Sequence, residues 1–499
     1  MATYSVQRES HRILEEHLLI NSQLSLPKEF VEAAKHVKIT GSDSNPFIPT
    51  PCKITESASA LSALAAAAGS AISADRYDIE HQNAEVDTDL ATLFLESIVL
   101  PTINGEPALQ HGPLMAELKK GDLYNMSKPI HQQATNVYQT KDGKWYHLHG
   151  SMNATATMGM VGVEEQDVTR EEAIKIFSDK VAQYDAAYLE KTANEDLKQA
   201  GVTCLTPEEF FASEHGKIMS GEPLWTMRPI AASRSTWPQQ KSNKLKPLEG
   251  IRVIDFSRVI AAPVISKILA VLGADVIKVS NQNLPDVSGT WVDLSAGKKD
   301  TNIDLKIAEG KKAFEALVEG ADVLIDGYRP GVLGKHGFNS ESLRQINQKL
   351  LTGICSANSD YQTGLVGAIA VMQALFQRTK LDTTYDIDVS LTQYNIWYYR
   401  LGQYNAEQCK ALLARNEGFH VRHYDEMFSL VRKTHAAICK ARPELLKRPE
   451  YFVKMPGKDW GLDEDILILA PPFKLEKSVL DKAKKPWDPD ECADLGLRL

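Results

Sequence analysis

Closely spaced cysteines are missing from this sequence. The six cysteines among its 499 residues are scattered, and no two of them form a CxxC pair. A disulfide framework or a structural zinc site needs cysteines at short, regular spacings, so the pattern indicates reduced thiols and no bound metal. A basic excess is also missing, because the net charge is -9. Nucleic-acid phosphates bind to a basic face, and this composition therefore argues against a nucleic-acid partner.

Long apolar runs are absent as well. The longest run of small apolar residues, at 60–73, is too short and too rich in Ala and Ser to span a bilayer, so no membrane partner is expected. The first residues, MATYSVQRESHRILEEH, are charged throughout and do not resemble a secretory signal. This pattern favours a cytoplasmic location. The ending Leu497-Arg498-Leu499 is weakly similar to the S-K-L peroxisomal signal and leaves a peroxisomal location open.

The common nucleotide fingerprints are lacking, since neither G-x-G-x-x-G nor a Walker A loop occurs at the key turn. The segment 250–280 nevertheless predicts a strand, a turn, a helix and a second strand. Pro263 suits the first helical turn, and later apolar residues recur on one helical face: Ile265, Ile268, Leu269 and Leu272. Short connections make the strands parallel. The helix start favours an anionic ligand, although a plain crossover or an NAD(P) oxidoreductase without its fingerprint fits the same pattern.

Four blocks of sequence together resemble one family. The segment 248–279 is similar to the N-terminal part of the family III CoA-transferases, the carnitine dehydratase/bile-acid-inducible type that includes formyl-CoA transferase and α-methylacyl-CoA racemase. Three further blocks follow in family order, at 293–306, 321–338 and 359–393. The resemblance implies an α/β fold, with a doubly wound, mostly parallel sheet domain from the second half and a smaller α+β domain mainly from the first. It also implies a homodimer, or a fused chain that mimics part of such a dimer by itself.

The order of the blocks suggests two fused, partly degraded copies. Residues 137–163 resemble the family's C-terminal hairpin, with Asp142-Gly143 at the turn, yet they precede the N-terminal blocks. A small-residue helix, a short strand and a further helix at 60–95 recur at 364–399. The predicted divisions are an N-terminal extension at 1–49, a first partial copy at 50–230, a linker at 231–247, a second partial copy at 248–410, comprising the nucleotide-binding segment and the start of the small domain, and a mixed C-terminal segment at 411–499.

The resemblance implies that coenzyme A binds as a thioester substrate at three loops. These are the turn after the first strand, a Lys/Arg loop and an "RPG" loop. Phosphates need several cations and adenine needs an apolar or aromatic platform. The alternative is that the lysines are ordinary surface charges. The residues carried over are Arg258, Val259, Ala261, Lys298, Lys299, Tyr328, Arg329, Val332 and Lys335.

The segment that carries the family's catalytic aspartate is missing, because LLTGICSANSDYQTGLVG at 350–367 runs directly into the helix. In the family that aspartate takes the acyl group as a mixed anhydride. Asp360 begins the helix beside the gap and is the remaining candidate, although a helix N-cap is the simpler explanation of an Asp at this position. His147 and His149 flank Leu148, point to one face of the hairpin and are candidate acid–base residues. A metal there would need a third ligand, and none is evident.

The predicted function is therefore that of an acyl-CoA-utilising enzyme that moves CoA between carboxylic acids. Its partners would be a small-molecule acyl-CoA and a carboxylic acid. The missing segment leaves three alternatives open: a racemase-like enzyme, a repurposed tailoring enzyme, or a family member that keeps the fold without the chemistry. The racemase branch also needs a Glu from the hairpin, and Asn153 stands at that position.

Overall fold

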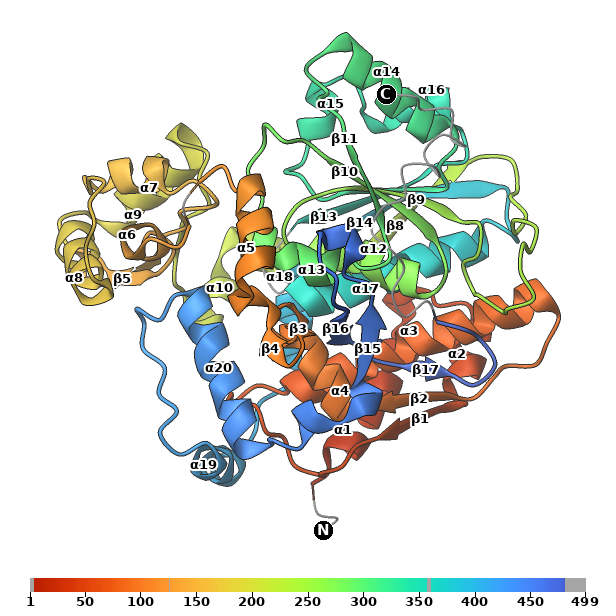
Figure 1. The fold of residues 1–499 in the computed structure, drawn as a ribbon, viewed down its shortest axis with the longest axis horizontal. Helices are drawn as coiled ribbons and strands as arrows, with labels where there is room; N and C mark the ends of the chain where they lie inside the picture. The colour runs from red at the N-terminus through yellow and green to blue at the C-terminus, as the bar shows by residue number, and fades with distance from the viewer. Residues whose placement is uncertain (1–3, 125, 357–359, 481–499) are drawn as a thin grey trace.

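The computed structural model describes residues 4–124, 126–356 and 360–480, and its centre is a seven-stranded sheet (Figure 1). The strands lie in the order β11-β10-β9-β12-β13-β14-β8. Neighbours from β11 to β14 pair in parallel, and β8 joins the edge antiparallel to β14. The mostly parallel α/β sheet is therefore as predicted. The strands are β8 Trp225–Ala231, β9 Arg252–Phe256, β10 Asp275–Ser280, β11 Lys299–Asn302, β12 Val323–Asp326, β13 Leu351–Ser356 and β14 Thr383–Ser390.

The predicted strand–helix–strand unit lies in the middle of this sheet. It consists of β9, α12 (Ala261–Val271) and β10, and β10 pairs with β9 in parallel. Gly273 follows the helix with φ +100°, a value that L side chains rarely adopt. The chain then places β10 and β11 on one side of β9 and β12 on the other. From β9 the chain continues toward one side of the sheet and from β12 toward the other, and parallel sheets form ligand crevices at the carboxyl ends of such a strand pair.

Both faces of the sheet are covered, because successive residues of a strand point to opposite sides. Val253 belongs to the large core that also contains α12 and α17 (Asp360–Gln377). Ile254 belongs to a second core formed with α14 (Ala308–Glu319) and α16 (Ser340–Ile346). Burial on two faces explains why these strands read as continuous apolar runs. Short helices complete this part of the chain: α13 Trp291–Leu294 and α15 Val332–Lys335.

Most of residues 4–100 pack into the large core, so the first half of the chain contributes both to this core and to the smaller lobe described below. The packing into the core depends on α3 (Ile54–Tyr77), whose small side chains allow close packing, and whose residues from Thr55 to Ser73 are buried. By length and composition α3 is the one described helix that could cross a membrane, but it lies in the core. Around it lie α1 Val6–Ile13, α2 Lys28–Ala34, β1 Val37–Thr40, β2 Ala84–Asp87 and α4 Thr88–Leu93.

A smaller α+β lobe stands apart from the sheet, at the left of Figure 1. Its hairpin joins β5 and β6 through a turn at Asp142-Gly143, where Gly143 has φ +77°. A core of its own includes the stacked rings of Tyr138 and Phe177. This lobe is the smaller α+β part of the molecule. Its elements, with the adjoining helices, are α5 Gly112–Leu118, α6 Pro129–Gln132, β5 Val137–Gln139, β6 Trp145–His147, α7 Thr155–Met160, α8 Arg170–Val181, α9 Ala186–Lys191, β7 Val202–Thr203, α10 Pro207–Ala212 and α11 Glu214–Met219.

The last part of the chain returns to the N-terminal part. β16 pairs with β3, and β17 pairs with β2, so 411–480 is not an independent segment. The second partial copy at 248–410 was predicted to contain the start of the small domain. The structure corrects this, because β14 is hydrogen-bonded on both edges inside the large sheet and α17 packs against it. The remaining elements are β3 Thr102–Ile103, β4 Glu106–Pro107, α18 Leu391–Arg400, α19 Ala406–Arg415, α20 Met427–Ala441, β15 Phe452–Met455, β16 Ile466–Leu469 and β17 Lys474–Leu475.

The repeated pattern noted in the sequence has a structural counterpart. The order α3, β2, α4 matches the order α17, β14, α18, and each last helix has a polar N-cap, Asp87 and Ser390 respectively. Fusion of two partial copies stays a prediction, since equal element order does not require common origin. The C-terminal Leu497-Arg498-Leu499 lies outside the described residues.

Candidate active site

Two loops meet at the point where β9 and β12 end. The Gly327 N–H donates to the Phe256 carbonyl at 3.0 Å. A Cβ atom on Gly327 would lie 2.5 Å from the Ser257 Cβ and 2.7 Å from the Ala262 Cβ. These separations are shorter than real carbon–carbon contacts, so only glycine allows the two loops to touch. The loop after β12 is thereby held directly beside the start of α12.

The turn after β9 contains a strained residue. Val259 has φ +64°, and a β-branched residue in the left-handed region is a conformational outlier that costs on the order of 1–3 kcal/mol. Such strain persists only where surrounding structure enforces it, and it concentrates at functional sites. Here it lies in the turn that joins β9 to α12, and we call the region bounded by this turn, the loop after β12 and the start of α12 the crevice.

Arg258 and Tyr328 form a cationic and aromatic surface across this crevice. The guanidinium lies 4.8 Å from the centroid of the Tyr328 ring, within cation–π range, and donates to the Pro285 carbonyl at 2.6 Å. On its other side the Tyr328 ring packs against Phe256, with 4.6 Å between centroids. Burial raises the pKa of Tyr328 to about 12, so its hydroxyl is neutral at physiological pH. The pair can therefore contact both a phosphate and a flat ring.

Lys298, one of the predicted CoA-binding residues, lies inside the protein. Its ammonium donates to the Asp255 carboxylate at 2.9 Å and to the Pro263 carbonyl at 2.8 Å, and the residue is 1% exposed. Burial lowers the pKa of Lys298 to about 8, although Asp255 opposes the shift. Burial would raise the pKa of Asp255, but Lys298 and two hydroxyls hold it below its usual value. Through these two contacts Lys298, which precedes β11, links β9 to α12.

The other predicted CoA-binding residues differ in exposure. Ala261 is buried as the first residue of α12. Half-buried positions around the crevice loops are Arg258, Val259, Tyr328, Val332 and Lys299, and the exposed ones are Arg329 and Lys335. Apart from Lys298 and Ala261, the residues named from the sequence thus reach the surface of the two loops and of β11. Whether they contact CoA stays a prediction.

Asp360 reaches the same crevice from α17. A Cβ on Gly364 would lie 2.4 Å from Val264, and one on Gly367 would lie 2.4 Å from Ile265, so these two glycines let α17 approach α12 closely. The Asp360 carboxylate then accepts a hydrogen bond from the Ala261 N–H at the start of α12. Burial raises the pKa of Asp360 to about 6, and this hydrogen bond limits the increase. Residues 357–359, just before it, lie outside the described part.

A buried polar network fixes the start of α17, and the sequence analysis did not identify it. The Tyr361 hydroxyl lies 3.4 Å from the Asp293 carboxylate, which also pairs with the Lys267 ammonium at 2.6 Å and accepts from the Ser97 hydroxyl at 2.7 Å. Asp293 and Tyr361 are less than a tenth exposed. The available signal was Lys267, the one charged residue of the largely apolar helix 261–271.

His147 and His149 lie in the small lobe. Their ring centroids are 6.3 Å apart, and burial lowers the pKa of both, so both are neutral at pH 7. The Nδ1 of His149 accepts from the Ser151 N–H at 3.1 Å. Arg329 of the loop after β12 donates to the Lys198 carbonyl, and its charge further lowers the pKa of His149.

The structure therefore brings His149 toward Arg329. No contact among the described residues joins either histidine to Asp360. Within residues 4–480, apart from those left undescribed, no group of three or more His, Cys, Asp or Glu side chains could hold a metal ion. The described free thiols are Cys52, Cys204, Cys409 and Cys439.

Comparison with known proteins decides the family. The family model of CoA-transferase family III matches residues 248–357. An acetyl-coenzyme A transferase, nodX, from Hypoxylon pulicicidum is 31% identical and aligns with 96% of this chain and 91% of its own length. This chain belongs to CoA-transferase family III. The resemblance noted from the sequence blocks is thus confirmed, and the chain is a transferase-type enzyme of this family.

Other relatives of this family III protein share less of the chain. An acyl-CoA transferase from Gibberella moniliformis is 26% identical over 71% of this chain and 72% of its own. A formyl-CoA:oxalate CoA-transferase from Escherichia coli is 34% identical over 21% of this chain and 29% of its own. A hypothetical protein from Mycobacterium tuberculosis covers 51% of this chain and 100% of its own at 17% identity, with a TM-score of 0.36.

The alignment with the Hypoxylon relative bears on the block order and on the missing segment. It spans both halves of the family III chain, so the order of the blocks is shared with that relative. It is also 544 positions long, longer than the 499-residue chain. The relative therefore contains stretches that this chain lacks.

Proposed function

We propose that this family III enzyme transfers CoA from an acyl-CoA donor to a carboxylic acid, with Asp360 as the nucleophile. The observation that carries the proposal is the position of the Asp360 carboxylate, half-buried at the start of α12 and hydrogen-bonded to the Ala261 N–H. A helix start favours negative charge and supplies free N–H groups. At neutral pH, one unit above its pKa, this carboxylate is mostly ionised and poorly solvated, which suits a nucleophile.

The proposed CoA site follows the two loops of the crevice. Arg258, Arg329 and Lys335 would meet the phosphates, because guanidinium and ammonium groups bind phosphate oxygens by charge-assisted hydrogen bonds. The half-buried Tyr328 ring, already beside a cation, offers a platform for adenine. Lys298 is left out, since Asp255 and Pro263 occupy its ammonium. The order of the strands and the helices on both faces support a doubly wound sheet. In such sheets ligands bind at the carboxyl ends of the strands where the strand order reverses.

The proposed reaction has balanced steps. Asp360 attacks the thioester carbonyl, forming a mixed anhydride and releasing the CoA thiolate. The thiolate then attacks the aspartyl carbonyl, giving an aspartyl–CoA thioester and the first carboxylate. The acceptor carboxylate reverses these steps, and Asp360 is regenerated as a carboxylate. Through the cycle the Ala261 N–H is placed to stabilise negative charge that develops on the aspartyl oxygen.

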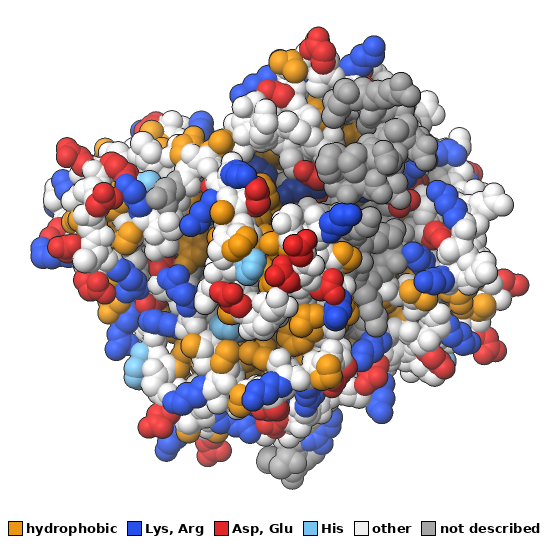
Figure 2. Space-filling view, in the orientation of Figure 1, with side chains coloured by type: hydrophobic (Ala, Val, Ile, Leu, Met, Phe, Trp, Pro, Cys, Tyr) orange, Lys and Arg blue, Asp and Glu red, His pale blue; other side chains and the backbone are white. Residues whose placement is uncertain are grey.

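The distribution of charge on the surface is compatible with small-molecule partners. On the face shown in Figure 2, Lys and Arg side chains are interspersed with Asp and Glu, which does not resemble a nucleic-acid surface. We further propose a homodimer and a cytoplasmic location, with the peroxisome as the alternative. Catalysis is proposed without a metal.

A second candidate function follows from the segment missing before Asp360. The chain would keep the fold as a scaffold without transferase chemistry, and no substitution of Asp360, His147 or His149 would then change its biological output. A racemase-like reaction would need a base near the acyl carbon. In the described contacts both histidines belong to the small lobe and neither joins Asp360, which favours the transferase.

The test compares Asp360→Asn with Asp326→Asn in CoA exchange between acetyl-CoA and a panel of short carboxylic acids. Asp326 is a matched control, because burial raises its pKa to about 6 as well, but its carboxylate accepts from Tyr328 within its own loop. Exchange is expected to vanish in Asp360→Asn and to persist in Asp326→Asn. Hydroxylamine added during turnover should convert Asp360 to a hydroxamate detectable by mass spectrometry. Full exchange by Asp360→Asn would overturn the assignment.

A further inference from the structure

Three titratable side chains outside the proposed CoA site lie together at the contact between α20 and the segment Phe94–Val99. The Cys439 Sγ lies 3.4 Å from the His435 Nε2, and the His435 Nδ1 lies 3.5 Å from the Glu96 Oε1. Cys439 and His435 are one helical turn apart, whereas Glu96 is 339 positions away from His435 in the sequence. A thiol, an imidazole and a carboxylate in this order are the elements of an activated nucleophile.

Burial and backbone geometry set the carboxylate apart from a surface acid. Glu96 is 9% exposed, and its Oε2 is a buried oxygen without a hydrogen-bond partner among the described atoms. Its backbone leaves the helical region, with φ -120° and ψ 19°. Glu96 raises the pKa of His435 through their hydrogen bond. The imidazole is therefore oriented by one ring nitrogen and presents the other to the thiol.

The thiol is reachable while the carboxylate is not. Cys439 and His435 are both partly exposed, and the His435 side chain is 31% exposed. Burial and the Glu96 charge raise the pKa of Cys439, so free thiolate is scarce at neutral pH. Reaction at this sulfur therefore depends on a neighbouring base that removes the proton as the new bond forms.

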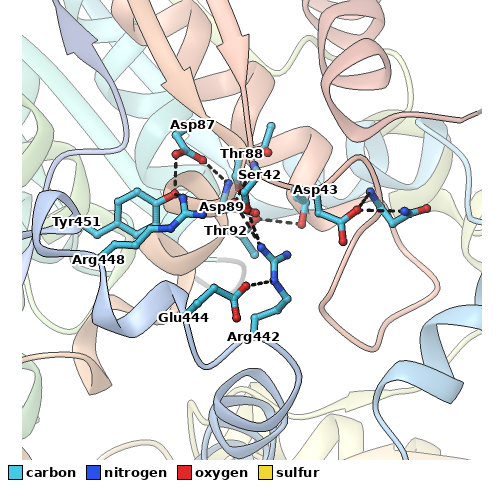
Figure 3. Close-up of polar contacts among 12 residues, drawn as sticks. Ser42, Asp43, Asp87, Thr88, Asp89, Thr92, Arg442, Glu444, Arg448 and Tyr451 are labelled. Atoms are coloured by element: carbon cyan, nitrogen blue, oxygen red, sulfur yellow. Dashed lines mark hydrogen bonds and ion pairs between the residues drawn. The ribbon is translucent and has the colours of Figure 1, made fainter.

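The end of α20 that carries Cys439 is fixed to the element that carries Glu96. Arg442, which caps α20, donates to the Ser42 hydroxyl at 2.7 Å and lies 3.7 Å from the Asp89 carboxylate on α4 (Figure 3). Nearby, Tyr451 donates to Asp87, the N-cap of α4, at 2.5 Å. Because α4 leads directly into Phe94–Val99, these bonds hold the thiol, imidazole and carboxylate in one geometry.

We propose that Cys439 is a second nucleophile, which takes an acyl group from a thioester with His435 as general base and Glu96 as the group that orients the imidazole. The Sγ attacks the thioester carbonyl while its proton passes to the His435 Nε2. The carbonyl–sulfur bond of the donor then breaks, and the departing thiolate takes the proton from His435. The products are an S-acyl cysteine and a free thiol, with no oxidant or reductant required. The choice of a thioester as electrophile rests on the proposed function.

Cys204 provides an internal comparison. Among the described residues it is the exposed one of the four free thiols, and its thiol contacts the backbone of His147 rather than an imidazole. Exposure alone would make Cys204 the faster thiol, whereas base assistance would make Cys439 the faster one. The two explanations therefore predict opposite orders of reactivity within one molecule.

The first experiment measures alkylation of the full-length protein by iodoacetamide at neutral pH, with mass spectrometry to follow each cysteine. Cys439 is expected to react at least tenfold faster than Cys204, and the advantage should disappear in His435→Ala and shrink in Glu96→Gln. His435→Asn, which keeps a polar side chain beside Glu96, covers the case in which the alanine variant folds poorly. A faster Cys204, or an unchanged rate in both His435 variants, would overturn the proposal.

The second experiment uses S-acetyl-N-acetylcysteamine, a thioester without a nucleotide, on the Asp360→Asn background. A gain of one acetyl group on Cys439, lost in Cys439→Ser and reduced at least tenfold in His435→Asn, is the expected result. Absence of the acetyl group, or its persistence in His435→Asn, would refute the proposal. Because the probe does not need the crevice, the outcome is independent of CoA exchange, which is measured separately on the protein with Asp360 intact.

Discussion

The carboxylate of Asp360, the first residue of α17, accepts a hydrogen bond from the backbone N–H of Ala261, the first residue of α12. The first N–H groups of a helix have no partner within that helix, and here a side chain from a second helix supplies one. Two glycines of α17 permit the close approach on which this contact depends. One structural arrangement therefore completes a helix terminus and places a carboxylate in the crevice.

Asp360→Asn should affect stability and activity in opposite directions. The folded-state pKa of Asp360 is raised from 3.8 to about 6, so the folded state binds this proton more tightly than the unfolded state does. The stabilising contribution of this group is therefore fully present below about pH 4. It is lost as pH rises through about 6, and the free energy of unfolding falls by at most about 3 kcal/mol. Exchange needs the ionised form and should fall as pH drops below about 6.

Urea denaturation and exchange assays at pH 4.5 and pH 8 would check this prediction. Relative to the wild-type protein, Asp360→Asn should gain stability at pH 8 and little at pH 4.5, because it removes the buried charge and keeps an oxygen for the Ala261 N–H. An equal difference in stability at the two pH values would contradict the raised pKa.

Gly364→Ala should separate α17 from α12. The new Cβ would lie 2.4 Å from the Val264 Cγ1 and 2.9 Å from the Ala261 carbonyl oxygen, and overpacking of this kind costs roughly 1–3 kcal/mol. Exchange should fall with stability, because Asp360 moves. Gly159→Ala in α7 is the control, since its Cβ meets nothing within 4 Å. Urea midpoints would compare the two variants, and similar midpoints would show that α17 has room.

The sequence could predict the local units of this fold but not their long-range partners. The strand–helix–strand unit from Arg252 to Ser280 follows from apolar spacing, and the hairpin turn follows from Asp142-Gly143. The place of β14 could not be predicted, because its edge partner β8 lies more than 150 residues upstream. Local pattern does not report such pairing.

The candidate site was predictable to a similar extent. The crevice loops were predicted from motifs and their order, and Asp360 was the carboxylate left beside the missing segment. Lys298 looked like one of two loop lysines, and only its 2.9 Å contact with Asp255, 43 positions away, shows that it faces inward. The pairing of Glu96 with His435 spans 339 positions and leaves no local signal. Contacts of this kind depend on tertiary packing, which a single sequence does not specify residue by residue.

Lys298→Met should destabilise the protein without acting through CoA. It leaves the fully buried Asp255 carboxylate without its cation, and loss of one partner of a buried pair costs roughly 3–5 kcal/mol. Asp255→Asn added to it should recover part of that loss, because the unpaired charge is removed. Lys335→Ala, at an exposed position, should change stability by less than about 0.5 kcal/mol. Thermal or urea unfolding would compare the three variants. If Lys298→Met were as stable as Lys335→Ala, Lys298 would not have this structural role.

Arg258→Ala should weaken CoA binding by roughly tenfold to a hundredfold, because a hydrogen bond to a charged group contributes about 1.5–3 kcal/mol. Arg258→Lys keeps the charge but not the planar stacking on Tyr328, so its affinity for CoA should lie between those of the wild-type protein and Arg258→Ala. Lys175→Ala, which removes one exposed positive charge from α8 of the small lobe, is the matched control and should bind CoA normally. Isothermal titration of CoA gives the three dissociation constants. Equal constants for Arg258→Ala and Lys175→Ala would remove Arg258 from the site, and with it the cationic half of the surface that it forms with Tyr328.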